Sequence, residues 1–146
     1  MAVFKRLWAS LALAAAVLTG AAAAHADPQF PDLNGQRVVD DAHILSDATK
    51  TDLTLKLQGL EQATTDQMVI VTVPDLQNYP IEDYGYQLGR HWGIGQSGQE
   101  KASNGQTYKD NGILLIVAPN ERKVRIEVGY GLEGTLTDAL TKFIIE

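Results

Sequence analysis

The chain has 146 residues, of which 12 are lysine or arginine and 18 are aspartate or glutamate, so its formal net charge is −6 at neutral pH. An acidic chain is a poor match for nucleic acid, whose phosphates attract basic surfaces. The absence of cysteine excludes disulfides, zinc–cysteine sites and cysteine nucleophiles.

The first 26 residues are typical of a secretory signal peptide. Lys5 and Arg6 precede an uncharged, alanine- and leucine-rich stretch over residues 7–24, and Ala24-His25-Ala26 is a small-x-small cleavage pattern. We therefore expect cleavage after Ala26 and export to the periplasm or another extracytoplasmic space. The alternative is an uncleaved membrane anchor, because the stretch over residues 7–24 is nearly as long as the roughly 20 apolar residues that such an anchor needs. The processed chain would lose two basic residues and no acidic ones, which gives a formal charge of 10 − 18 = −8.

Residues 27–36, with two prolines, a glycine and an asparagine, predict an extended lead-in, and residues 37–146 predict one α/β domain. A short strand is expected at residues 37–40. Ser46 is a favourable N-cap for a helix that runs to about Ala63. Its apolar stripe consists of Leu53, Leu57 and Leu60.

The next elements alternate between buried strands and an amphipathic helix. Residues 67–73 are a β-branched run typical of a strand covered on both faces. Pro80 favours the start of a helix that ends near Trp92, and a long polar loop over residues 93–109 follows.

Residues 113–118 predict a second buried strand, and residues 119–122 a tight turn. In the strand at residues 123–128, we expect the three apolar side chains to point inward and the charged ones outward, with the strand half exposed at an edge. Thr137 can cap a last helix, which we expect to be incomplete at Glu146.

A helix between two buried strands implies a right-handed parallel crossover. The sequence thus predicts a βαβ unit followed by a β-hairpin, in a mixed sheet with helices packed on both faces, which is an α/β/α sandwich.

Several collinear motifs carry a resemblance to a known family. They are Val38-Val39-Asp40, Ile81-Glu82-Asp83-Tyr84, Trp92-Gly93-Ile94-Gly95, Asp110-Asn111-Gly112, Ala118-Pro119, and the run 125–134 followed by Leu136-Thr137-Asp138. From about Phe30 to Ile145 the chain resembles the TPM domain family, named for its thylakoid-lumen, photosystem-repair and modulator members.

The resemblance implies an α/β/α domain on the outer side of a membrane. It also implies acid phosphatase activity as in plant members, divalent-cation binding as in some members, or receptor modulation as in some animal members. Bacterial relatives often continue into a membrane anchor, so membrane attachment would come only through a C-terminal anchor absent from this chain. Residues 99–109 resemble an insertion relative to the family.

The predicted topology brings four polar residues to one end of the sheet, although they lie far apart in the sequence. They are Asp110, Asn111, Glu133 and Asp138. Such oxygen ligands suit Ca²⁺ or Mg²⁺. Each also has a structural explanation, because Asp-Asn-Gly is common turn chemistry and a carboxylate is favourable in the first turn of a helix.

Asp40, Asp41 and Asp75 are the second-choice cation site, at the opposite end of the sheet. Open α/β sheets bind ligands beyond the carboxyl ends of their parallel strands, but these residues also suit a solvated approach to a helix.

No motif identifies a catalytic residue. Residues 93–98 match G-x-G-x-x-G, but they follow a helix and open a loop, so we expect no nucleotide cofactor. His43 and His91 lack a partner motif for acid–base catalysis.

We therefore expect an extracytoplasmic, divalent-cation-binding accessory module for an exported or membrane-associated partner. The alternatives are a metal-assisted acid phosphatase, which would act on phosphate monoesters, and a purely structural protein-interaction module.

Overall fold

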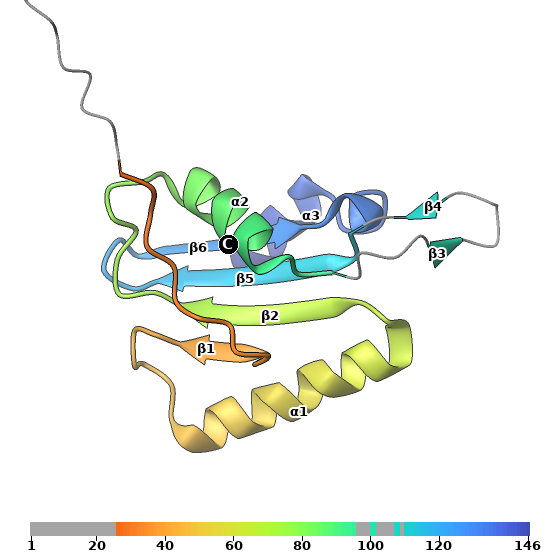
Figure 1. The fold of residues 1–146 in the computed structure, drawn as a ribbon, viewed down its shortest axis with the longest axis horizontal. Helices are drawn as coiled ribbons and strands as arrows, with labels where there is room; N and C mark the ends of the chain where they lie inside the picture. Colours follow the sequence, from red (N-terminus) through yellow and green to blue (C-terminus); the bar gives the residue numbers. More distant parts are fainter. Residues whose placement is uncertain (1–25, 96–99, 102–106, 109) are drawn as a thin grey trace, which may run out of the picture.

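The computed structural model describes residues 26–95, 100–101, 107–108 and 110–146 (Figure 1). Residues 1–25 of the expected signal peptide lie outside this part of the chain. The elements in chain order are β1 (Val38–Asp40), α1 (Asp47–Thr64), β2 (Gln67–Thr72), α2 (Ile81–Trp92), β3 (Glu100–Lys101), β4 (Thr107–Tyr108), β5 (Gly112–Ala118), β6 (Lys123–Val128), the 3₁₀ turn η1 (Tyr130–Leu132) and α3 (Asp138–Ile145).

The main sheet has the strand order β1-β2-β5-β6. β1 runs parallel to β2 with Val39 opposite Val71, and β2 runs parallel to β5. β5 and β6 form the expected antiparallel hairpin, with Leu115 opposite Ile126. The mixed sheet predicted from the sequence is therefore confirmed, and β1 and β6 are its two edges.

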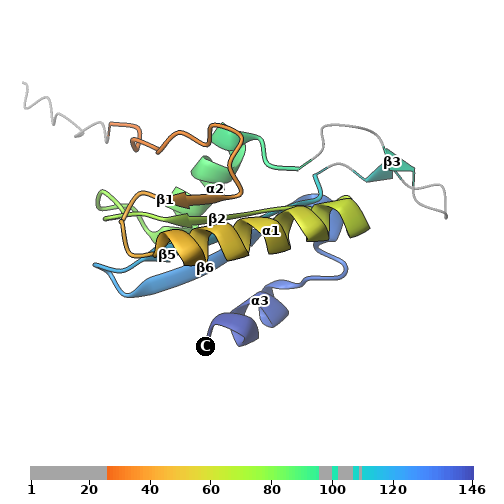
Figure 2. The same cartoon turned by 90° about the horizontal axis from the view of Figure 1, so that it is seen from below.

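Helices cover the sheet from both sides (Figures 1 and 2). On one face α2 packs Tyr84 and Leu88 against Leu114 and Ile116, and all four side chains are buried. α1 covers β1 and β2 on the opposite face, where a smaller core cluster lies, and α3 packs on β6. This is the three-layer α/β/α arrangement that was expected.

Local sequence explains the two long helices. The hydroxyl of Ser46 accepts a hydrogen bond from the Thr49 backbone N–H and so caps α1. Only Leu57 of its apolar stripe is fully buried. α2 follows Pro80 and ends at Gly93, whose φ of +58° suits a residue without a side chain.

The N-terminal residues 27–36 form no helix or strand, but they pack along the α2 face of the sheet (Figure 1). Gln29 and Gln77 exchange two hydrogen bonds of 2.8 and 2.6 Å between side chain and backbone. The Trp92 indole N–H donates to the Pro31 carbonyl at 2.9 Å. The extended lead-in is thus tied to α2 and to the loop that precedes it.

β6 differs from the expected inward and outward alternation. Val124, expected to face inward, is 40% exposed, whereas Arg125 and Glu127 are half-buried. The charged side of β6 faces α2, which lies close because Gly85 has no side chain. The apolar side faces α3, which leaves Val124 partly open.

Within the expected loop over residues 93–109, the described residues include a two-residue antiparallel pair, β3 with β4. Among the helices that the structure describes, none is long and apolar enough to span a bilayer.

Candidate functional site

An open pocket of about 690 Å³ lies where α2 ends and the β5–β6 hairpin begins and ends. Asp110 enters it from the turn before β5, and Glu133 from the turn after β6. Two backbone hydrogen bonds join these segments, from Gly129 N–H to the Gly112 carbonyl at 2.7 Å and from Gly131 N–H to the Asp110 carbonyl at 3.0 Å. We call this the Asp110 pocket; Glu127, Arg90, Tyr86 and Tyr130 also line it.

Three glycines hold the backbone around Asp110 closely packed. A Cβ at Gly129 would lie 2.2 Å from the Asp110 carbonyl oxygen, and one at Gly112 would lie 2.4 Å from the Ile94 carbonyl oxygen. Gly95 has φ +104°, and a Cβ there would meet an Asp110 carboxylate oxygen at 2.8 Å. Side chains at these positions would force the segments apart.

Asp110 itself adopts φ +75°, a left-handed conformation that is uncommon for a residue with a side chain. Its side chain is exposed, and its carboxylate accepts no hydrogen bond from any residue in the described part of the chain. The Asp110 carboxylate therefore lines the pocket without a hydrogen-bond donor among the described residues.

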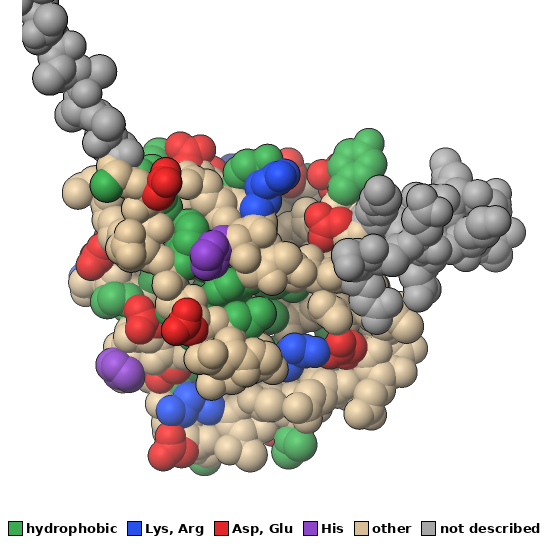
Figure 3. Space-filling model, in the orientation of Figure 1, with side chains coloured by type: hydrophobic (Ala, Val, Ile, Leu, Met, Phe, Trp, Pro, Cys, Tyr) green, Lys and Arg blue, Asp and Glu red, His purple; other side chains and the backbone are tan. Residues whose placement is uncertain are grey.

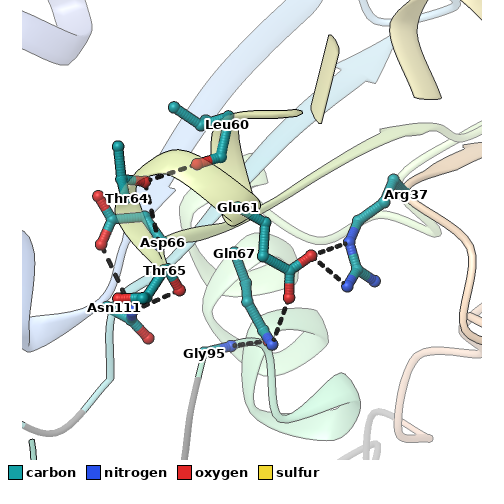
Figure 4. Close-up of polar contacts among 9 residues, drawn as sticks. All are labelled: Arg37, Leu60, Glu61, Thr64, Thr65, Asp66, Gln67, Gly95 and Asn111. Carbon is teal, nitrogen blue, oxygen red and sulfur yellow. Dashed lines mark hydrogen bonds and ion pairs between the residues drawn. The ribbon is translucent and has the colours of Figure 1, made fainter. Parts of the chain in front are cut away.

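Asn111 is positioned differently, although it is the next residue. Its side-chain amide donates to the Thr65 carbonyl at 2.8 Å and lies 3.4 Å from the Asp66 carboxylate (Figure 4). The Asn111 side chain therefore joins the end of α1 to the start of β5, and it does not line the Asp110 pocket.

A second group of polar contacts links residues of α1 and β2 to Gly95, which also lines the Asp110 pocket (Figure 4). Arg37 pairs with Glu61, Glu61 accepts from the Gln67 amide at 3.0 Å, and Gln67 accepts from the Gly95 backbone N–H at 3.1 Å. Gln67 thus fixes Gly95, whose backbone lies against Asp110. The pattern of residues 67–73 indicated only a strand, so it did not predict this role of Gln67.

Asp138 lies apart from the other predicted ligands. It lines a second open pocket of about 590 Å³, bounded by β6, α3 and the start of α2, together with Lys142 and Glu82. Burial lowers the pKa of nearby Arg125, but the hydrogen bond and charge of Glu127, with the charges of Glu82 and Asp138, raise that pKa overall. Of the four residues predicted for the cation site, the structure thus brings only Asp110 and Glu133 into one pocket.

Among the described residues, no three histidine or acidic side chains converge closely enough to hold a metal ion. Acidic and basic side chains are scattered over the face shown in Figure 3, outside the part that grey atoms cover. Any cation bound at the Asp110 pocket would therefore need ligands beyond the carboxylates of the described residues.

The second-choice residues lie at the opposite end of the sheet, as expected from the topology. The Asp40 carboxylate accepts hydrogen bonds from Ile44 N–H at 3.1 Å, from Leu45 N–H at 3.0 Å and from the Thr72 hydroxyl at 2.6 Å. Burial alone raises the pKa of Asp40, but these three bonds and the charge of Lys50 lower it overall. Asp40 thus supports the turn that leads into α1.

Asp75 accepts a hydrogen bond from Gln77 N–H at 2.8 Å within a turn, whereas the Asp41 side chain is exposed. The charges of both carboxylates affect the pKa of Tyr84, a residue that is only 1% exposed. Burial, followed by the charges of Asp41 and Asp75, raises the pKa of Tyr84 to about 12.

Sequence reasoning missed the aromatic and basic residues of the Asp110 pocket. The Arg90 guanidinium lies 5.6 Å from the Tyr86 ring centre, and Tyr130 is 80% exposed. The spacing of Tyr86 and Arg90 by one helical turn was visible in the sequence, but nothing there showed that this side of α2 faces the end of β6. Of the glycine motif at residues 93–98, the structure describes only residues 93–95, where Gly93 is the C-terminal cap of α2; the rest lies outside the described residues.

Comparison with known proteins places this architecture in a family. The sequence model described as the TPM domain matches residues 38–146, so the chain belongs to the TPM domain family. No curated protein gives a significant match.

Two solved structures resemble the fold. The N-terminal domain of a protein from P. gingivalis has a TM-score of 0.62 and 35% identity, with 75% of this chain and 64% of that chain covered. The N-terminal domain of a protein from Corynebacterium glutamicum has a TM-score of 0.55 and 17% identity, with coverage of 79% and 65%. The chain therefore spans slightly less than two thirds of either domain, and the second likeness supports the fold alone.

Proposed function

We propose that the protein is an extracytoplasmic TPM domain that binds a divalent cation, Ca²⁺ or Mg²⁺, at the Asp110 pocket. In this proposal the cation helps the domain to bind an exported or membrane-associated partner. The single observation that supports it most is the Asp110 carboxylate, which has no donor among the described residues although its backbone is held at φ +75°.

The ligand count favours a shared site. Ca²⁺ takes six to eight oxygen ligands, and Mg²⁺ keeps several waters. Asp110 and Glu133 supply two carboxylates to the pocket, and Glu127 is already paired with Arg125. Waters, or an oxygen group of the partner, would complete the coordination of the cation.

A metal-assisted phosphatase is the second candidate, because Arg90 lines the same pocket as the carboxylates. A guanidinium pairs well with phosphate, and a bound cation lowers the pKa of a water that could attack it. Among the described residues we find no side chain placed as a nucleophile, so any hydrolysis would depend on the cation.

The test is thermal unfolding of the protein purified from the periplasm, with Ca²⁺, Mg²⁺ or EDTA. A cation at 100 times its dissociation constant adds about 2.7 kcal/mol to the free energy of unfolding. For a domain of this size the midpoint would rise by roughly ten degrees. N-terminal sequencing of the same sample checks cleavage after Ala26.

Asp110→Asn and Glu133→Gln should abolish the rise in the midpoint, and Asp41→Asn is the matched control that should keep it. No rise at millimolar cation would contradict both the cation site and the metal-assisted phosphatase. Cation-dependent hydrolysis of a phosphate monoester, lost in Asp110→Asn, would favour the enzyme over the accessory module.

A further inference from the structure

Edge strand β6 carries a pattern that is complementary to itself. Its residues 124–128 read Val-Arg-Ile-Glu-Val, so the apolar residues are symmetric about Ile126, while Arg125 and Glu127 carry opposite charges at equal distances from it. Two such strands in antiparallel register, each with Ile126 opposite Ile126, would place every apolar residue against an apolar one. The same register would place Arg125 of each copy opposite Glu127 of the other.

The backbone of β6 has the polarity that this register needs. Gly129 and Gly112 form a hydrogen-bonded pair, and such pairs alternate along an antiparallel ladder. Lys123, Arg125 and Glu127 therefore direct their backbone groups toward β5. The N–H and C=O groups of Val124, Ile126 and Val128 point away from the sheet, and within the described residues β5 is the only strand paired with β6.

Both faces beside this edge have open space. The Asp110 pocket lies on the α2 side of β6. The pocket of about 590 Å³ extends across the edge of β6 from the start of α2 to α3, since Glu82 and Asp138 both line it. Side chains of an incoming strand would point alternately toward the α2 side and the α3 side of the sheet, and both sides have space for them. Val124 and Ile126 would supply an apolar surface on the α3 side.

Charges along the edge are also arranged for an antiparallel copy. Arg122 and Lys123 lie exposed at one end of β6, while Asp110 and Glu133 lie beyond its other end. Pairing centred on Ile126 brings the basic end of each copy beside the acidic end of the other. Arg125 can serve both chains, because Nε bonds Glu127 of its own chain and its terminal nitrogens have no partner among the described residues.

We propose that a second copy of this chain docks on β6, strand to strand about a two-fold axis between the two Ile126 residues. The dimer joins two four-stranded sheets into one continuous sheet. This arrangement covers the exposed edge, which is otherwise a liability for uncontrolled pairing. It does not depend on a cation at the Asp110 pocket, so it is tested in EDTA.

The first experiment uses sedimentation of the periplasmic protein from micromolar to millimolar concentration. A reversible monomer–dimer equilibrium is expected. Arg125→Glu and Glu127→Arg should each weaken the dimer about ten- to hundredfold, because opposite charges across the strands become like charges at two symmetric places. The double variant with both reversals should restore it, and Lys56→Glu on α1 is the matched control that should leave it unchanged.

The second experiment uses the natural absence of cysteine. Opposed residues of a hydrogen-bonded pair have Cα atoms about 5.5 Å apart, which suits a disulfide. The Ile126→Cys variant should therefore form a covalent dimer on mild oxidation. The Val124→Cys variant should not, since its counterpart in the other copy lies four residues away along the ladder.

A chain that stays monomeric at millimolar concentration overturns the proposal. So does a dimer that survives both single charge reversals, because it must use another surface. If a single reversal prevents folding, as judged by circular dichroism, the double variant and the cysteine pair still decide the question.

Discussion

Acidic residues lie at both ends of the sheet, but the surroundings of Asp40 and Asp110 differ. At the end near Asp40, two carboxylates are occupied by protein donors, with three hydrogen bonds on Asp40 and one on Asp75. At the other end, Asp110 has no donor from the described residues and is held in a strained conformation. Acidic residues at the two ends therefore differ in their hydrogen-bond partners, which their positions in the sequence did not indicate.

The largest effect is expected from adding a side chain at a glycine that is in close backbone contact at the Asp110 end of the sheet. Gly112→Ala places a methyl group 2.4 Å from the Ile94 carbonyl oxygen, so the backbone must move. We expect the free energy of unfolding to fall by about 3 kcal/mol, measured by urea denaturation. Gly59→Ala on α1 is the control, since beyond the adjoining backbone of its own helix nothing lies within 4 Å of its added methyl group. Helix propensity should raise its stability by about 0.5–1 kcal/mol. Equal effects of the two changes would contradict the close packing around Asp110.

The next largest effect is expected from removing the hydrogen-bonded carboxylate of Asp40 at the opposite end of the sheet. Asp40→Ala removes the acceptor of three hydrogen bonds and should lower the free energy of unfolding by about 2–3 kcal/mol. Asp41→Ala, at the neighbouring exposed carboxylate, should change it by less than about 0.5 kcal/mol.

Asp40 also predicts a dependence on acid. Its pKa is lower in the folded protein than in the unfolded chain, so its contribution is present at neutral pH. That contribution is lost as pH falls below the unfolded value and through the folded pKa. Urea midpoints measured down to acidic pH should therefore fall less steeply for Asp40→Ala than for the unaltered chain. Parallel curves would show that Asp40 does not carry this acid sensitivity.

Tyr84 gives the corresponding test in alkali. Its folded pKa of about 12 lies above the ordinary value of 10.0, so the folded protein resists ionisation of this side chain. Stability should be unaffected below pH 10 and should decrease as pH rises from about 10 to 12. The decrease should be smaller in Tyr84→Phe. Tyrosinate absorbance and circular dichroism, recorded during an alkaline titration, would measure it. An unchanged titration in Tyr84→Phe would assign the effect to other tyrosines.

The smallest effect on stability should come from Asp110 itself. Asp110→Gly relieves the positive φ but frees the unfolded chain, so the free energy of unfolding should change by less than about 0.5 kcal/mol in EDTA. A loss as large as that of Asp40→Ala would mean that the Asp110 carboxylate has a structural role, and it would remove the contrast between the two ends.

The sequence was sufficient for the order and type of the main elements. Apolar runs predicted β2 and β5, Ser46 and Pro80 predicted where α1 and α2 begin, and the alternation at residues 123–128 predicted β6. These signals are local, since they depend on side-chain periodicity and backbone preference within one element. The TPM motifs predicted the family, which the match over residues 38–146 confirms.

Only the tertiary structure decided which polar residues share a site. Asp110 and Asn111 are neighbours in sequence, yet Asp110 lines the pocket and the Asn111 side chain bonds the Thr65 carbonyl at the end of α1. Asp138 begins α3, and the position of that helix on β6 separates it from Glu133. Burial and hydrogen-bond partners depend on contacts between distant segments. The sequence therefore determined the layers of this protein, and the packing between them determined which carboxylates share a pocket and which accept hydrogen bonds from the protein.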